Sequence, residues 1–518
     1  MNIEIKLLSA RSITFVLNDC GIYNTDEKYS VYLNSKFVKE TDTVVNSLFH
    51  LKPDTDYELT IKKGSENVCS ASFHTKYEFV TLNVKDFGAK GDGRSDDTKY
   101  IQAAILACPK DSRVLIPRGV YLCTSLFLKS DISIEIEKFA EIKAITKREE
   151  YVKLPSVIES YDEEKEYILG TWEGNPLPMF AAIIMGVNVS NVILYGEGVI
   201  NGNASKDDWW HQPKVMRGAF RPRLFHINSC ENIYLQGLTF TNSPSWTLHP
   251  FFSNNLGFYN LLVMNPAVSP NTDGLDPESC KNVEIMGVHF SLGDDCIAVK
   301  SGKIYMGKKY KTPSENILVS QCLMENGHGA VTIGSEMAGG VKNLTVKECL
   351  FVNTDRGLRI KTRRGRGEDA IIDGITFKNI KMDHVMTPFV VNAFYFCDPD
   401  GKIPYVQSRE PMPVDDRTPR LKKFLFEDIK AENCYVAATW IEGLPECKVE
   451  EIAMRNILVT YAEDIKKDVP AMSLGVEASS KKGITVKNVK KLLLENVTVT
   501  GQEGDEITVE NVDEYVRK

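Results

Sequence analysis

The 518-residue chain lacks any uninterrupted run of about 18 apolar residues, the length that a membrane-spanning helix needs. Cysteine is scarce, with 12 residues in the whole chain, which excludes a disulfide-stapled miniprotein. The chain also has no excess of basic over acidic residues. The formal net charge is −8, which makes the chain a poor non-specific binder of nucleic acid and other polyanions. Any anionic ligand therefore needs a local basic site.

Two further patterns are missing. The first residues, Met1–Lys6, alternate charged and apolar side chains and do not resemble a secretory signal. Taken as the native start, they predict a cytoplasmic location and free thiols. No C-x-x-C spacing occurs, so we expect no metal and no cofactor. We also expect no nucleic-acid or membrane partner, and the oligomeric state stays open.

Residues 1–77 read as short alternating strands. Leu51–Tyr57 has the form L-x-P-x-T-x-Y, in which the Tyr side chain can bond back to the corner before it. The stretch resembles a fibronectin type III module, which is a small β-sandwich. Such a module binds carbohydrate, or it acts as a spacer or a lid beside a catalytic cleft, and we favour the second interpretation.

Residues 78–518 contain an internal repeat of the form Asn, apolar, any, apolar, two of any, apolar, any, apolar. The clear copies begin at Asn232, Asn255, Asn282, Asn316 and Asn343. Short strands joined by a bend cannot bury their apolar faces alone, whereas stacked coils share one core. The repeat therefore predicts an all-β, right-handed parallel β-helix. A propeller is disfavoured, because its four-stranded blades need about 40 residues or more.

The same alignment makes two local predictions. The interior position occupied by Leu238, Leu261 and Val288 holds Cys322 and Cys349 in later copies, which predicts buried thiols rather than metal ligands. Ahead of the repeat, residues 97–107 have the apolar spacing of a helix that covers the open end of the stack.

Four short polar segments lie in the middle coils: Asn271–Gly274, Gly293–Asp295, Gly327–Gly329 and Arg359–Lys361. The strands that follow them align at the interior residues Leu275, Ile297, Val331 and Leu358.

In this register, Asp273 and Asp295 stand two residues before the aligned position, and Asp294 and His328 stand three before it. Neighbouring strands are about 4.8 Å apart, so three carboxylates and one imidazole converge on one patch.

A positive half lies beside this acidic patch. Arg359 and Lys361 flank the interior Ile360 and point away from the coil interior, and Arg363, Arg364 and Arg366 follow. Clustered acids oppose simultaneous ionisation, so one of them holds its proton and suits a general acid paired with a carboxylate base. The chemistry predicts hydrolysis of an acidic polysaccharide, whose negative groups the Arg and Lys side chains bind.

The set N-T-D, D-D, G-H-G and R-I-K on a predicted β-helix resembles glycoside hydrolase family 28, the polygalacturonases, over roughly residues 80–460. This resemblance implies a pectin-lyase-like fold and cleavage of α-1,4-linked galacturonate with inversion. By matching motifs it implies that Asp294 donates the proton and that Asp273 and Asp295 activate water. His328 supports the acid, and Arg359 and Lys361 bind the galacturonate carboxylate. Asn271 belongs to the same motif with a less defined role.

Large insertions favour an exo-acting enzyme that trims oligogalacturonates. They span 147–178 and 397–420, with a further wall at 209–223. Trp172, Trp209, Trp210 and Trp246 are candidates for stacking on sugars, and Tyr395 is a candidate for facing the reaction centre.

Several alternatives stay open: an endo-polygalacturonase, a rhamnogalacturonan or xylogalacturonan hydrolase, a calcium-dependent pectate lyase, or a non-catalytic polysaccharide-binding β-helix.

Overall fold

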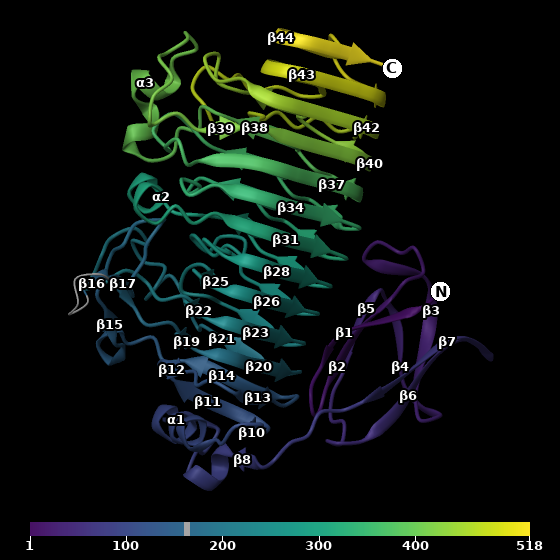
Figure 1. The fold of residues 1–518 in the computed structure, drawn as a ribbon, viewed down its shortest axis with the longest axis vertical. Coiled ribbons are helices and arrows are strands. Elements are labelled where there is room, and N and C mark those ends of the chain that lie inside the picture. The colour runs from purple at the N-terminus through teal and green to yellow at the C-terminus, as the bar shows by residue number, and fades with distance from the viewer. Residues whose placement is uncertain (160–165) are drawn as a thin grey trace.

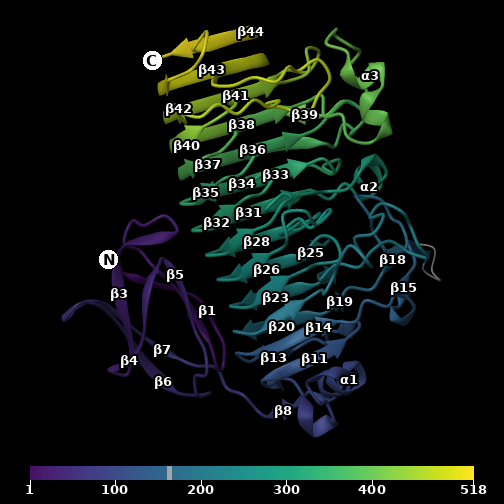
Figure 2. The ribbon, with the colours of Figure 1, turned by 180° about the vertical axis from the view of Figure 1, so that it is seen from behind.

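The computed structural model describes residues 1–159 and 166–518. A small antiparallel module at the N-terminus stands beside a long stack of parallel β-coils (Figure 1). Seen from behind, the coils rise from α1 (Thr98–Ala107) at one end of the stack to the C-terminus at the other (Figure 2). The predicted fold class is therefore confirmed, including the helix that covers the open end.

The N-terminal module has two sheets, with strand orders β1-β2-β5 and β4-β3-β6-β7. The strands are β1 (Ile3–Leu8), β2 (Ile13–Leu17), β3 (Asn24–Leu33), β4 (Lys36–Thr43), β5 (Val45–Leu48), β6 (Asp56–Lys63) and β7 (Glu66–His74). Apolar side chains from both sheets, among them Phe15 and Ile61, form a core of their own. The Tyr57 hydroxyl accepts a hydrogen bond from the Lys52 backbone N–H at 2.8 Å, which confirms the predicted tyrosine corner.

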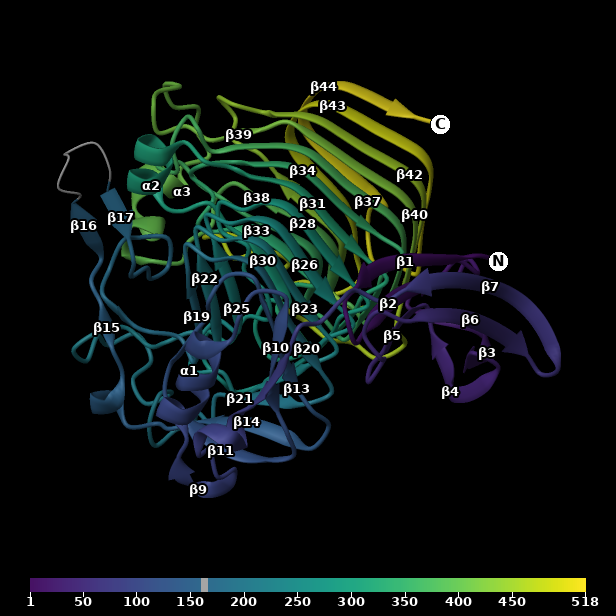
Figure 3. The same cartoon turned by 60° about the horizontal axis from the view of Figure 1, so that its bottom comes forward.

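This module is attached to the outer face of the coil stack. Val45 packs against Tyr259 and Met286 in a small apolar cluster. Gly287, with φ of 64°, is required at this contact, because a Cβ there would lie 2.4 Å from Val45 Cβ. Polar bonds reinforce it, since Ser12 Oγ donates to Gln236 Oε1 at 2.7 Å. Figure 3 shows the module on the opposite side of the stack from the loop-bearing strands β16 and β17.

The coils form three ladders of parallel strands. The first contains β8 (Thr81–Asn83), β10 (Ser112–Ile116), β13 (Ile132–Ile136), β20 (Ser190–Gly196), β23 (Glu231–Gln236), β26 (Asn254–Tyr259), β28 (Lys281–Met286), β31 (Ser314–Ser320), β34 (Val341–Lys347), β37 (Ile371–Asp383), β40 (Lys423–Cys434), β42 (Val449–Tyr461), β43 (Lys482–Thr500) and β44 (Ile507–Arg517). The second contains β9 (Asp92–Asp96), β11 (Gly119–Cys123), β14 (Ala140–Ala144), β21 (Val199–Asn201), β24 (Thr239–Thr241), β27 (Leu262–Met264), β29 (His289–Ser291), β32 (Leu323–Glu325) and β35 (Leu350–Val352), and then joins β37.

The third ladder carries the polar segments. It contains β12 (Leu126–Phe127), β19 (Ile184–Val187), β22 (Phe225–Asn228), β25 (Leu248–Phe251), β30 (Ile297–Val299), β33 (Val331–Gly334), β36 (Arg356–Lys361), β38 (Thr387–Asn392) and β41 (Ala437–Glu442). Leu275 bridges β25 to β30.

Elements outside the ladders decorate the loops and ends. They are η1 (Val84–Phe87), η2 (Arg148–Glu150), β15 (Lys153–Leu154), β16 (Val157–Glu159), β17 (Glu166–Ile168), β18 (Met179–Phe180), α2 (Ile304–Tyr310), η3 (Pro399–Lys402), α3 (Pro404–Gln407) and β39 (Arg420–Leu421). None of the helices in the described part of the chain has the length and hydrophobicity needed to cross a bilayer.

The repeated Asn has a structural reason. Asn282, Asn316 and Asn343 each turn the chain with a φ between 53° and 57°, a region that Asn tolerates better than most residues. Their amides stack as a ladder: Asn316 Nδ2 donates to Asn282 Oδ1 at 3.2 Å, and Asn343 Nδ2 donates to Asn316 Oδ1 at 3.1 Å. The motif thus fixes both the bend and the stacking of successive coils.

We expect Asn316→Ala to destabilise the coil stack by about 1–2 kcal/mol, because alanine has no side-chain amide to hydrogen-bond locally and so tolerates a left-handed backbone less well than Asn. The denaturant midpoint of unfolding measures this loss. Asn316→Gly is the matched control, because glycine keeps the backbone conformation and removes only the amide ladder. Equal losses in the two variants would contradict a backbone origin.

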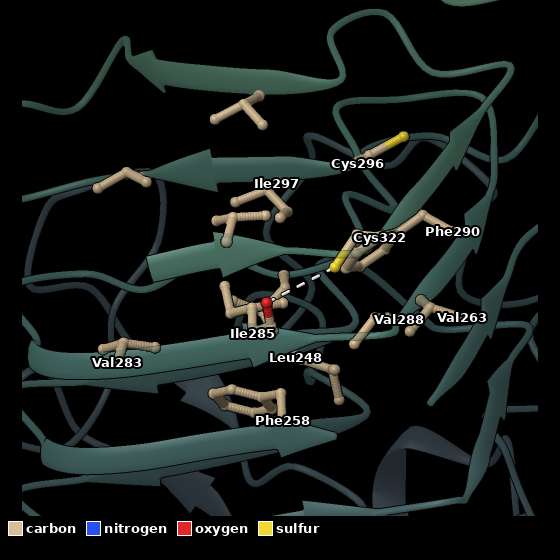
Figure 4. Packing of buried hydrophobic residues seen from close by; sticks show 14 of the residues in the cluster. Leu248, Phe258, Val263, Val283, Ile285, Val288, Phe290, Cys296, Ile297 and Cys322 are labelled. Carbon is tan, nitrogen blue, oxygen red and sulfur yellow. Dashed lines mark hydrogen bonds between the residues drawn. The ribbon is translucent and has the colours of Figure 1, made fainter. Parts of the chain in front are cut away.

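The interior position predicted from the repeat is buried in every copy, from Leu238 to Cys349. All twelve cysteines are free, as predicted. Figure 4 shows Cys322 among packed aliphatic side chains, with its Sγ 3.6 Å from the Ile285 carbonyl oxygen. Cys322 and Cys349 are therefore core residues, whereas Cys20 is exposed.

Candidate active site

The predicted register of the third ladder is confirmed. Leu275 pairs with Ile297, Ile297 with Val331, and Val331 with Leu358. The polar segments immediately before these residues therefore meet at one edge of the ladder. One oxygen from each of Asp273, Asp294 and Asp295 lies within 4.8 Å of the other two.

Asp295 is the most firmly bound of the three carboxylates. Its Oδ1 accepts a hydrogen bond from Arg359 Nη1 at 3.0 Å, and its Oδ2 accepts one from Lys361 Nζ at 2.6 Å. Burial raises the pKa of Asp295, but the charges of Lys361 and Arg359 outweigh burial and hold that pKa well below its usual range. Asp295 is therefore a carboxylate in the folded protein.

Asp294 pairs with the predicted imidazole. His328 Nδ1 lies 3.6 Å from Asp294 Oδ1, which also accepts a hydrogen bond from the Asp295 backbone N–H at 2.9 Å. Burial raises the pKa of Asp294, whereas His328 lowers it, and the net pKa lies below the usual value. The same pair raises the pKa of His328.

In Asp273, the influences that raise the pKa are larger than those that lower it. Burial, the charge of Asp294 and the charge of Asp276 together raise the pKa of Asp273 well above its usual value. In the free protein the retained proton therefore belongs on Asp273, whereas the resemblance gives the donor role to Asp294. The roles of the individual carboxylates stay predictions.

The cluster opens into a cavity of about 410 Å³. Of the sequence-predicted residues, the cavity is lined by Asn271, Asp273, Asp294, His328, Arg359, Lys361, Trp246 and Tyr395. Asn271 Oδ1 accepts a hydrogen bond from Arg221 Nη2 at 2.8 Å, which ties the N-T-D segment to the 209–223 wall. None of the described residues that line the cavity comes from the N-terminal module. The role of the module as a spacer or a lid therefore stays a prediction.

Comparison with known proteins identifies the architecture. The family model described as glycosyl hydrolases family 28 matches residues 109–469. The chain belongs to this family. A probable polygalacturonase from Vitis vinifera is 30% identical over 416 residues, covering 76% of this chain and 79% of that protein.

Two solved structures of related enzymes are similar to this family 28 chain. An exopolygalacturonase from Thermotoga maritima has a TM-score of 0.64 at 26% identity, covering 82% of this chain and 93% of that one. A family 28 exopolygalacturonase from Yersinia enterocolitica has a TM-score of 0.71 at 19% identity, covering 99% of this chain and 98% of that one. The second likeness shows that the fold recurs over nearly the whole length of the chain.

The predicted positive half of this hydrolase site is smaller than the sequence indicated. Arg359 and Lys361 lie at the cavity but are buried and bonded to Asp295. Arg363 donates to Asp400 at 2.9 Å and Arg364 to the Ser408 carbonyl oxygen at 2.7 Å, both in the 397–420 insertion. Because insertion loops supply their partners, these arginines anchor the cavity wall, and the expectation that they extend the patch is wrong.

The tryptophans separate into core and cavity residues. Trp209 is 0% exposed and packs edge-on against Tyr151 and Phe180, so it cannot stack on a sugar. Trp172 stacks on Phe220 with ring centroids 4.7 Å apart. Trp210 donates from Nε1 to the Ser243 carbonyl at 3.0 Å. Of the four candidates, Trp246 lines the cavity.

Sequence reasoning missed Lys300 and Glu336, which also line the cavity. A signal for Lys300 was present. It follows Val299, whose side chain is interior, so strand alternation turns Lys300 toward the same outer face as Lys361. The segment 468–472 had no such signal, because it lies in an insertion without periodicity.

The three carboxylates have a spacing at which divalent cations are held in other proteins. Here both oxygens of Asp295 already accept hydrogen bonds from cationic side chains. A divalent ion would have to displace those partners, so we assign no metal to the cluster.

Proposed function

We propose that this family 28 hydrolase cleaves α-1,4-galacturonosyl linkages of oligogalacturonates with inversion and acts from one chain end. The observation that carries the proposal is that Asp273 and Asp294 of the acid cluster line the same cavity as Arg359 and Lys361. Asp294 donates a proton to the leaving oxygen, Asp273 and Asp295 activate water, and His328 supports the acid. Arg359 and Lys361 bind the substrate carboxylate. A cytoplasmic setting, in which short oligogalacturonates are the accessible substrates, belongs to the same proposal.

The cavity walls support action at a chain end. Glu173 comes from the first insertion, Lys214 from the 209–223 wall, and Asp398 from the second insertion. Lys214 Nζ lies 3.5 Å from Glu173, which links two of the walls.

Part of the first insertion, residues 160–165, lies outside the described residues. Arg409 and Arg417 of the second insertion bond to Glu442 and Asp415.

Product analysis on a defined oligogalacturonate series tests this proposal. We expect monomer to appear from one end at every time point, because a walled cavity admits a chain end and excludes the middle of a chain. A spread of intermediate sizes would show endo action instead. An unsaturated, ultraviolet-absorbing end that disappears with EDTA would show a calcium-dependent lyase.

The same digest reports the stereochemistry. Inversion predicts that the first-formed product is the β-anomer, which proton NMR resolves before mutarotation. An α-anomer as the first product would contradict the inverting assignment.

A further inference from the structure

Lys300 is a buried cation to which the proposed mechanism gives no role. Its side chain is 3% exposed, and its Nζ lies 3.2 Å from Glu336 Oε2, 3.4 Å from Asp276 Oδ1 and 3.8 Å from Asp273 Oδ2. The ammonium also lies 4.3 Å from the centre of the Trp246 ring. A fully buried lysine is retained only where several partners compensate for its lost hydration.

The ladder register explains why Lys300 reaches the acid cluster. Val299 pairs with Ile333 on the next coil, so the following residues Lys300 and Gly334 are neighbours. Gly334 in turn pairs with Lys361. Two lysines therefore stand in one row across three coils, with a glycine between them. Lys361 contacts Asp295, and Lys300 lies on the side of Asp273.

We propose that Lys300 is a positioning residue that lowers the pH at which Asp273 loses its proton and becomes a water-activating base, and that Glu336 limits this effect by sharing the charge of Lys300. The inference rests on the proposed function and deepens it. Without Lys300, Asp273 would be a buried acid facing other acids and would keep its proton to still higher pH.

The charges that face Asp273 come from every element around it. Asp294 and Asp295 precede β30, Asp276 follows Asp273 on its own coil, and Lys300 approaches from the end of β30. The buried guanidinium groups of Arg221 and Arg223, from the 209–223 wall, also interact with Asp273. Glu336, Asp276 and Asp273 surround Lys300, and Asp295 lies further away.

Burial raises the pKa of Asp276 to about 7, so this residue is largely neutral in acid. Burial also raises the pKa of Glu336, but Lys300 and Lys303 outweigh it, and the pKa of Glu336 lies well below its usual value. Glu336 therefore stays ionised and competes with Asp273 for the charge of Lys300.

The first experiment is the pH dependence of kcat/KM for Lys300→Met on an oligogalacturonate. Methionine keeps the length of the side chain and removes the charge. An opposite charge at this distance lowers the pKa of a carboxyl by about one to three units. The acidic limb should therefore move to higher pH by at least about one unit, with activity recovering above the new limb. A uniform loss at all pH values with an unmoved limb would overturn the proposal.

A second variant moves the limb in the other direction. Glu336→Gln leaves Lys300 with one fewer carboxylate partner, so Asp273 gains more of its charge and the acidic limb should move to lower pH. This variant decides the question if Lys300→Met does not fold, which thermal unfolding reports. Lys308→Met on α2 is the matched control, because that lysine is about half exposed and pairs with Asp416. An unmoved limb in Glu336→Gln would also overturn the proposal.

The two proposals fail in distinguishable ways. If the wild-type protein releases no galacturonate, the proposed function fails. If the wild-type protein is active and the limb of either variant stays in place, the function stands and the role of Lys300 is wrong.

Discussion

Asp294→Asn should lower kcat on oligogalacturonate by at least about 100-fold while substrate binding persists. Positioned general acids contribute about 10²–10⁴-fold, and an amide cannot deliver a proton to the leaving oxygen. Asparagine has nearly the same shape, and its side chain still lies at the cavity mouth beside His328. Single-turnover kinetics and direct binding measurements separate the two effects. Unchanged turnover would reject the assignment of Asp294.

In the free site the neighbouring charges place the proton on Asp273 and not on Asp294. The Asp294→Asn and Asp273→Asn variants should therefore be compared on the same substrates. An aryl galacturonide with a good leaving group needs little help from an acid. We therefore expect the loss in Asp294→Asn to shrink on this substrate and the loss in Asp273→Asn to remain. The reverse pattern would exchange the two roles. Asp355→Asn is the control, since Asp355 also lines the cavity but its side chain is 40% exposed.

Lys361→Ala should raise KM by about 10- to 100-fold. A hydrogen bond to a charged group contributes about 1.5–3 kcal/mol, and about 1.4 kcal/mol corresponds to a factor of ten. Steady-state kinetics on an oligogalacturonate series measures the change. Lys308→Ala is the matched control, because it removes an exposed lysine outside the cavity. A kinetically silent Lys361→Ala would remove the claim that this residue binds a carboxylate.

The structure adds a second consequence for the same variant. Lys361 Nζ also bonds to Asp295 at 2.6 Å, so its removal leaves a buried carboxylate with Arg359 as its remaining charged partner. Loss of one partner from a buried pair destabilises proteins by about 3–5 kcal/mol, and the remaining Arg359 should keep the loss below that range. A lowered melting temperature should therefore accompany the raised KM. Lys361→Arg should recover the melting temperature more fully than the KM, since an arginine keeps the charge but changes the geometry of the contact.

The periodic part of this protein was readable from its sequence. Strand alternation and the recurring Asn predicted the parallel β-helix, the buried position of Cys322, and the pairing of Leu275 with Ile297. Because that register follows from a side-chain period of two, it also predicted that Asp273 and Asp295 reach one edge. The L-x-P-x-T-x-Y motif likewise predicted a local contact, the bond between Tyr57 and Lys52.

Tertiary structure alone decided how the charges are distributed. Lys361 and Arg359 are bound to Asp295, Lys300 stands beside Asp273, and the segment ending at Met472 lines the cavity from a distant coil. Repeats report the contacts that recur from coil to coil. The pKa of a buried carboxyl depends instead on through-space distances of a few ångströms, and insertion loops adopt their conformations without any period. The sequence therefore determined which residues meet, whereas the folded structure decided which of them carry charge.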